Sequence, residues 1–192
     1  MRLGVLVSGR GSNLEAVLRA GIPEVEPVVV VSNRRAIPAL EIAAAFSVPT
    51  VVLRRADHDG DAGARDAAIG AALERHGVDL ALLAGYDQML RAPFFAAFTG
   101  RTINIHPSLL PAHGGPGMIG TAVHRSVLAA GEPLTGVTIH EVTPEVDAGP
   151  ILAQSRVRVM PADTADELAA RVLEEEHRLL VATLTRIARG AI

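Results

Sequence analysis

Two short, wholly apolar runs constrain the fold more than any other feature of the sequence. Residues 28–31 are four consecutive valines, and residues 80–83 read Leu-Ala-Leu-Leu. A strand that is apolar on both sides must be covered on both sides, which is typical of a central strand in a parallel sheet. The two runs therefore predict an α/β chain whose sheet has helices on both faces.

Other segments continue the alternation of strand and helix along the chain. Apolar runs with β-branched residues predict strands, and apolar residues at helical spacing predict helices. The expected strands are residues 3–8, 27–32, 50–53, 80–83, 102–105, 134–142 and 151–159. The expected helices are residues 13–20, 40–46, 64–76, 119–129 and 164–187. We predict a single domain over residues 1–192 with an open, mostly parallel, twisted sheet of Rossmann-like type and an antiparallel last strand.

Composition removes several classes of chemistry. The chain has no cysteine, which excludes disulfides, thiolate nucleophiles and cysteine-ligated metals. All 18 basic residues are arginine, so the lysine-dependent phosphate loop of nucleotide hydrolases is also excluded. The net charge is −3 without a basic block, which argues against a nucleic-acid partner. No apolar run is long enough for a membrane span, and the N-terminus lacks a signal layout, so we expect a cytoplasmic protein without a membrane partner.

A glycine loop, Ser8-Gly9-Arg10-Gly11-Ser12-Asn13, joins the first expected strand to the first helix. Ligands of open α/β sheets bind at the carboxyl ends of strands, and the N–H groups of a helix N-terminus favour an anion such as phosphate. We expect Ser12 or Asn13 to cap this helix. The loop matches neither the dinucleotide fingerprint nor the P-loop, and a plain tight turn is an equally good interpretation.

The stretch Asn104-Ile105-His106-Pro107 ends the fifth expected strand. Residues two apart on a strand point to the same face, so Asn104 and His106 are expected to project together. An amide and an imidazole side by side suit the binding of an oxyanion. Asp147 lies in a predicted turn, and a carboxylate beside His106 would favour the imidazolium and accept a proton. Sequence spacing does not bring Asp147 to His106, and structural roles for all three remain open.

These residues resemble a known family, the folate-dependent formyltransferases, and most closely the phosphoribosylglycinamide formyltransferases. The resemblance runs from Val5 to about Glu176 and is carried by residues 8–13, 83–86, 104–111 and 146–151. It implies transfer of a formyl group from 10-formyltetrahydrofolate, as a co-substrate, to the amine of glycinamide ribonucleotide in purine synthesis. No tightly bound cofactor and no metal are implied.

The resemblance also implies roles for individual residues. The catalytic trio it implies is Asn104, His106 and Asp147. The implied site for the substrate phosphate and ribose comprises Gly11, Ser12, Asn13, Arg65 and Glu176. The implied folate pocket comprises Met89, Leu90, Val142 and Thr143, and two further histidines near the site, His124 and His140, are expected to support it. The sequence departs from the family at Asp87-Gln88, where many members have Met-Arg, and in the glycine-rich segment 113–120.

Three alternative functions remain, two of them enzymatic and one of them non-catalytic. Hydrolysis of 10-formyltetrahydrofolate uses the same fold, but those enzymes carry an additional N-terminal domain, for which we expect no room before the first strand. Formylation of methionyl-tRNA needs a C-terminal RNA-binding domain, and we expect the chain to end with its last helix. A non-catalytic phosphate- or nucleotide-binding module would need the glycine loop but not the Asn104–His106 pair. We expect small-molecule partners and a monomer or homodimer.

Overall fold

The computed structural model describes residues 1–192, and its backbone contacts divide the chain into two compact units, Met1–Ile103 and Asn104–Ile192. Seven strands form a sheet in the order β3-β2-β1-β4-β5-β6-β7. The boundary between the units falls within β5 (Arg101–His106). The predicted α/β fold class is confirmed, whereas the single domain over residues 1–192 stays a prediction.

The first unit has a parallel core made by β1 (Arg2–Val7), β2 (Glu26–Ser32), β3 (Thr50–Val52) and β4 (Leu80–Leu83). Strand β1 pairs with β2 on one side and β4 on the other, and β2 pairs with β3, all in parallel. The valine run of β2 and all of β4 are buried, as two-sided apolar strands require. The carboxyl ends of three neighbouring parallel strands, β2, β1 and β4, consequently lie at one edge of this unit.

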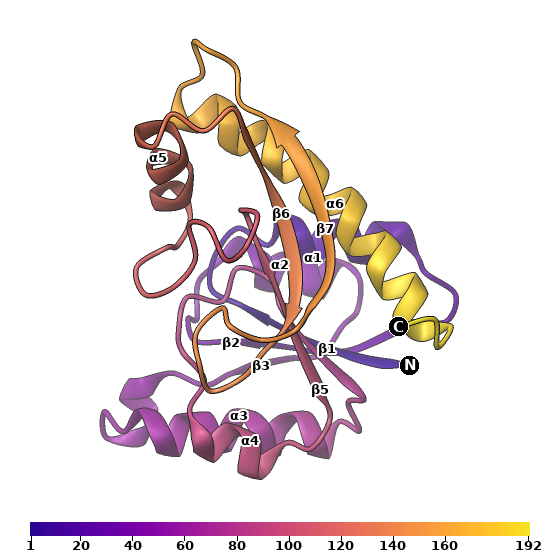
Figure 1. The fold of residues 1–192 in the computed structure, drawn as a ribbon. Helices are drawn as coiled ribbons and strands as arrows, with labels where there is room; N and C mark the ends of the chain where they lie inside the picture. Colours follow the sequence, from indigo (N-terminus) through magenta and orange to yellow (C-terminus); the bar gives the residue numbers. More distant parts are fainter. The chain divides into compact units, whose positions relative to one another are not determined.

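Four helices cover these strands: α1 (Ser12–Ala20), α2 (Pro38–Ala45), α3 (Ala62–Arg75) and α4 (Ala92–Ala97). Helices α1 and α2 contact each other, as do α3 and α4, and Figure 1 shows the two pairs on opposite sides of the strands. Helix α3 begins where the Asp61 carboxylate accepts hydrogen bonds from the N–H groups of Gly63 and Ala64. It buries Ile69 and Leu73 completely, which stabilises the fold by about 1.5–3 kcal/mol for each side chain.

The second unit contains the end of β5, α5 (Thr121–Ala129), β6 (Leu134–Glu141), β7 (Ile151–Arg158) and α6 (Ala165–Ala188). Strands β6 and β7 are antiparallel, as expected, with an irregularity between Ile139 and His140. Helix α6 packs along both strands and against α5 (Figure 1). It begins with a capping box, in which Thr164 Oγ1 accepts from the Glu167 N–H and the Glu167 carboxylate accepts from the Thr164 N–H.

All twelve predicted elements are present, with ends that agree or differ by at most two residues. Two were missed: the short helix α4 and a single 3-10 turn at Arg55–His58. Helix α4 has only six residues, too few for a helical period to stand out from an apolar stretch.

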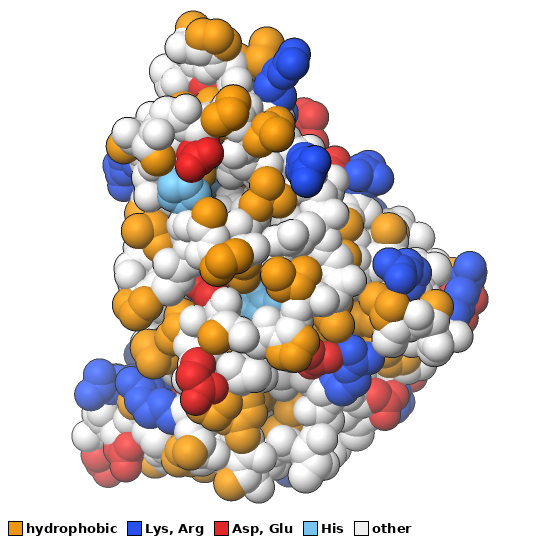
Figure 2. Space-filling view, viewed as in Figure 1, with side chains coloured by type: hydrophobic (Ala, Val, Ile, Leu, Met, Phe, Trp, Pro, Cys, Tyr) orange, Lys and Arg blue, Asp and Glu red, His pale blue; other side chains and the backbone are white.

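The surface carries no dominant charge on the face drawn in Figure 2. Acidic and basic side chains are scattered among apolar ones there, without a continuous basic block. None of the helices combines the length and the apolarity that crossing a lipid bilayer demands.

Candidate active site

Strand β5 ends at His106, immediately before Pro107, and its last residues carry the predicted Asn104 and His106. The His106 side chain is buried. Asn104 Nδ2 lies 3.1 Å from His140 Nε2, and His106 Nδ1 lies 3.8 Å from an Asp147 carboxylate oxygen. Both side chains therefore reach the same polar cluster, which confirms that they project together.

Asp147 is brought to this cluster by the tight loop between β6 and β7. A Cβ on Gly149 would lie only 1.9 Å from the carbonyl oxygen of Glu141, so no other residue fits at that position. Asp147 itself has φ +53°, a left-handed conformation that costs a non-glycine residue about 1 kcal/mol or more. The carboxylate consequently lies 3.6 Å from His140 Nε2 as well as near His106. The three predicted residues therefore lie together in the structure. Their catalytic role stays a prediction.

Backbone groups of the glycine-rich segment 113–120 hold the two ionisable members of the trio. The His113 carbonyl lies 2.9 Å from His106 Nε2 and can only accept, so this nitrogen carries the proton. The Gly115 N–H donates to Asp147 at 2.8 Å. Sequence reasoning missed both contacts, because backbone donors and acceptors carry no residue signature.

Burial has the largest influence on the protonation of His106. Burial lowers the pKa of His106, and this outweighs the raising effects of the His113 carbonyl and the Asp147 carboxylate. The pKa therefore lies below its ordinary value, which favours a neutral imidazole near pH 7. Asp147 favours the imidazolium, as expected, but the cost of burying that charge is larger than the attraction across 3.8 Å.

Asp147 stays ionised in spite of its burial. Burial raises the pKa of its carboxyl group, but the His140 imidazole, the Gly115 N–H and His106 outweigh that effect and leave the pKa below its ordinary value. The site therefore presents a carboxylate, an acceptor for a proton, next to a neutral imidazole.

His140 fixes the orientation of the Asn104 amide. Its Nδ1 lies 2.8 Å from the carbonyl oxygen of Glu141, and its Nε2 lies 3.1 Å from Asn104 Nδ2, so the ring is held at both nitrogens. The amide can then direct its second N–H elsewhere. His124, on α5, is buried, and both its burial and His106 lower its pKa. Both histidines lie close to the trio, as expected of supporting residues.

The glycine loop of the first unit leads directly into α1. Gly11 is the N-cap residue, and no side chain caps the helix, so the expected cap by Ser12 or Asn13 is wrong. Gly11 has φ +80°, and a Cβ there would lie 2.7 Å from that of Ala39. The backbone therefore passes too close to α2 for any other residue. A helix that begins without a side-chain cap leaves its first-turn N–H groups to other acceptors, such as an anion.

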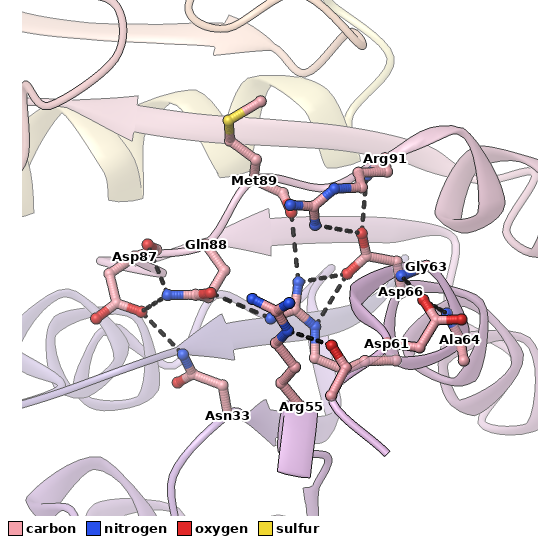
Figure 3. A network of polar contacts seen from close by, with 12 residues as sticks. Asn33, Arg55, Asp61, Gly63, Ala64, Asp66, Asp87, Gln88, Met89 and Arg91 are labelled. Atoms are coloured by element: carbon pink, nitrogen blue, oxygen red, sulfur yellow. Dashed lines mark hydrogen bonds and ion pairs between the residues drawn. The ribbon is translucent and has the colours of Figure 1, made fainter. Parts of the chain in front are cut away.

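Arg65 is deeply buried on α3, with an exposed fraction of 1%. Its guanidinium pairs with Asp66 at 2.5 Å and also reaches Gln88 and the carbonyl of Met89. Asp66 in turn accepts from the N–H and the side chain of Arg91 (Figure 3). The implied phosphate contact of Arg65 stays a prediction, and the contacts seen here join α3 to the segment that carries Met89 and Leu90.

The remaining predicted residues lie in three places. Met89 is half exposed, whereas Leu90 is buried. Val142 and Thr143 are partly exposed in the same loop as Asp147, where Thr143 donates to the Glu145 carbonyl. Glu176 is buried on α6. Their roles in binding folate or ribose stay predictions. No group of three or more histidine, aspartate or glutamate side chains has the arrangement of a metal site.

Comparisons with known proteins agree with this geometry. The model of the family described as "Formyl transferase" matches residues 1–184. A chloroplastic phosphoribosylglycinamide formyltransferase of Arabidopsis thaliana is 40% identical over 100% of this chain, which spans 66% of that relative's length. A phosphoribosylglycinamide formyltransferase of Mycobacterium tuberculosis is 44% identical over the whole chain, which spans 86% of its length. The crystal structure of glycinamide ribonucleotide transformylase 1 from Symbiobacterium toebii is 41% identical, with a TM-score of 0.91 over 99% of this chain and 88% of that one.

Proposed function

Because the chain belongs to the formyl transferase family, we propose that it transfers the formyl group of 10-formyltetrahydrofolate to the amine of glycinamide ribonucleotide. One observation carries this proposal. Asp147, which is distant in sequence from Asn104 and His106, lies with them at the end of β5. Folate acts as a co-substrate in this reaction, and no tightly bound cofactor is needed. Location in the cytoplasm, small-molecule partners alone, and a monomeric or homodimeric state belong to the same proposal.

The reaction begins with attack of the substrate amine on the formyl carbon. A new C–N bond forms and the formyl oxygen becomes an oxyanion, after which the bond to folate N10 breaks. The Asn104 amide and the Nε2–H of His106 stabilise the oxyanion, which replaces the His113 carbonyl as the acceptor. Asp147 accepts a proton of the amine, directly or through a water molecule, and folate N10 takes up a proton as its bond to the formyl carbon breaks, so that the step balances.

Substitutions at the trio test this mechanism. His106→Ala and Asp147→Asn are each expected to lower kcat by about 10²–10³, with little change in KM, because these groups act mainly in the transition state. Glu145→Gln is the matched control, since Glu145 is an exposed carboxylate in the loop that carries Asp147. Turnover within a few-fold of the wild type in either of the first two variants would remove the mechanism.

The hydrolase alternative is tested in the same assay. Folate absorbance is followed with glycinamide ribonucleotide present and then absent. A transferase requires the amine, whereas equal rates in both conditions would identify water as the acceptor and overturn the proposed function.

A further inference from the structure

Ser8, the first residue of the glycine loop, is held by two segments that the mechanism does not use. Ser8 is almost fully buried at the end of β1. Its carbonyl accepts from Arg34 Nη1 at 2.7 Å, and its hydroxyl accepts from the Asp87 N–H at 3.0 Å. Arg34 follows β2 and Asp87 follows β4, and these two strands are the neighbours of β1 in the sheet. The segments after both neighbours therefore bind the residue that follows β1.

Arg34 and Asp87 are also joined to each other. The Arg34 guanidinium pairs with one Asp87 carboxylate oxygen. The other oxygen accepts from Asn33 at 2.8 Å and from Gln88 at 3.2 Å (Figure 3). Burial raises the pKa of Asp87, but hydrogen bonds from Asn33, Gln88 and Ser8, and the charge of Arg34, leave that pKa lowered. The carboxylate is therefore charged at neutral pH and held on two sides.

The segment that carries Arg34 supports the glycine loop at a second point. It runs from the end of β2 to α2, where the Ala39 N–H donates to the Gly9 carbonyl at 3.2 Å. Ala39 is also the residue on which Gly11 packs. Three positions of the glycine loop, Ser8, Gly9 and Gly11, are thus held by residues that lie outside the loop.

We propose that Arg34 and Asp87 form a clamp that positions the glycine loop for the phosphate of the amine substrate. They are positioning residues, because they act through Ser8 and not on the reacting atoms. A loop whose N–H groups are fixed before binding loses less conformational freedom when the ligand arrives, so the clamp contributes to affinity. This inference rests on the proposed function, in which the glycine loop binds the phosphate.

Steady-state kinetics test the clamp. Arg34→Met removes the contact with Ser8 and the partner of Asp87, and we expect it to raise the KM for glycinamide ribonucleotide about 5- to 20-fold. The kcat and the KM for 10-formyltetrahydrofolate should stay within about twofold of the wild type, because the trio is untouched. Asp87→Asn should raise the same KM, and the two changes combined should raise it by less than the product of the separate effects.

Arg35→Met is the matched control. Arg35 is the next residue, it is more exposed than Arg34, and it pairs at 3.7 Å with Asp57 instead of with the loop. Its KM values should equal those of the wild type. A purely structural role for Arg34 would lower the thermal midpoint and kcat without a selective change in KM, and that pattern would overturn the clamp.

The role of Asp87 separates the clamp from direct contact. If Arg34 bound the phosphate itself, Asp87→Asn would free the guanidinium and leave the KM unchanged or lower it, and this result would also overturn the clamp. Calorimetric titration with ribose 5-phosphate provides an independent readout, in which affinity should fall by the same factor as the KM rises. Failure of the wild type to bind ribose 5-phosphate or to transfer a formyl group would instead count against the proposed function.

Discussion

At the scale of single residues, the candidate site and its surroundings depend on polar groups with little access to solvent that are hydrogen-bonded or ion-paired. His106 donates to the His113 carbonyl, Asp147 accepts from Gly115, and Arg65 is paired with Asp66. Removal of one member leaves the other without a partner in a poorly solvated place, which costs more than the pair contributes. The Arg65–Asp66 pair shows this best, because both side chains are almost inaccessible to solvent.

Asp66→Ala should therefore destabilise the protein by about 3–5 kcal/mol, since it leaves the Arg65 guanidinium buried without its carboxylate. The double variant Arg65→Leu/Asp66→Leu should recover most of that loss, because no uncompensated charge remains. Chemical denaturation followed by circular dichroism measures both. Equal destabilisation by the single and the double variant would contradict this account.

At the scale of elements, each functional group is delivered by the end of a strand or helix. Strand β5 ends at His106, β1 leads into the glycine loop, and β6 leads into the loop of Asp147. Helix α6 is fixed at its own start by the capping box and by the pairing of Asp163 with Arg171 at 2.7 Å. That pairing makes the entry to α6 sensitive to acid.

Hydrogen bonds from Arg171 and from the Met160 N–H lower the pKa of Asp163 to about 2, from an ordinary 3.8. A carboxyl group whose pKa is depressed by folding adds stability above its unfolded pKa, and this stability is lost as pH falls through the folded pKa. The thermal midpoint of Asp163→Asn should thus lie below that of the wild type at pH 6.

The two midpoints should converge between about pH 4 and pH 2, where the wild type alone loses the stabilisation of the carboxylate. Scanning calorimetry across this range is the measurement. Asp166→Asn, at an exposed carboxylate three residues further on, is the control and should follow the wild type. A constant difference at every pH would contradict the assignment.

At the scale of the whole molecule, ligands that bind only the folded chain raise its stability. A ligand present at about 100 times its Kd adds about 2.7 kcal/mol. For a chain of this length that corresponds to a rise of roughly 5–10 °C in the thermal midpoint. The size of the shift and its ligand dependence report directly on what the chain binds.

Glycinamide ribonucleotide and a 10-formyl folate analogue should each produce such a shift, and together a larger one. NAD should produce no shift in the thermal midpoint, because the glycine loop does not match the dinucleotide-binding fingerprint. Differential scanning fluorimetry with each ligand at saturating concentration decides this. A response to NAD alone would favour a non-catalytic nucleotide-binding module.

Sequence by itself determined the elements and the chemistry available to this chain. Two-sided apolar runs such as 28–31 predict buried strands because an unbroken apolar run is a pattern within the segment itself. The spacing of Asn104 and His106 fixed their common face for the same reason. The absence of cysteine and lysine likewise needed no structure.

Only the tertiary structure decided which distant groups meet and what state they adopt. Asp147 reaches His106 through a loop that closes on the Glu141 carbonyl, and no pattern within either segment encodes that approach. The neutral state of His106 follows from burial by the surrounding chain, which a sequence does not display. Arg34, Asp87 and Ser8 come from the ends of three strands and meet only because the sheet places those strands side by side.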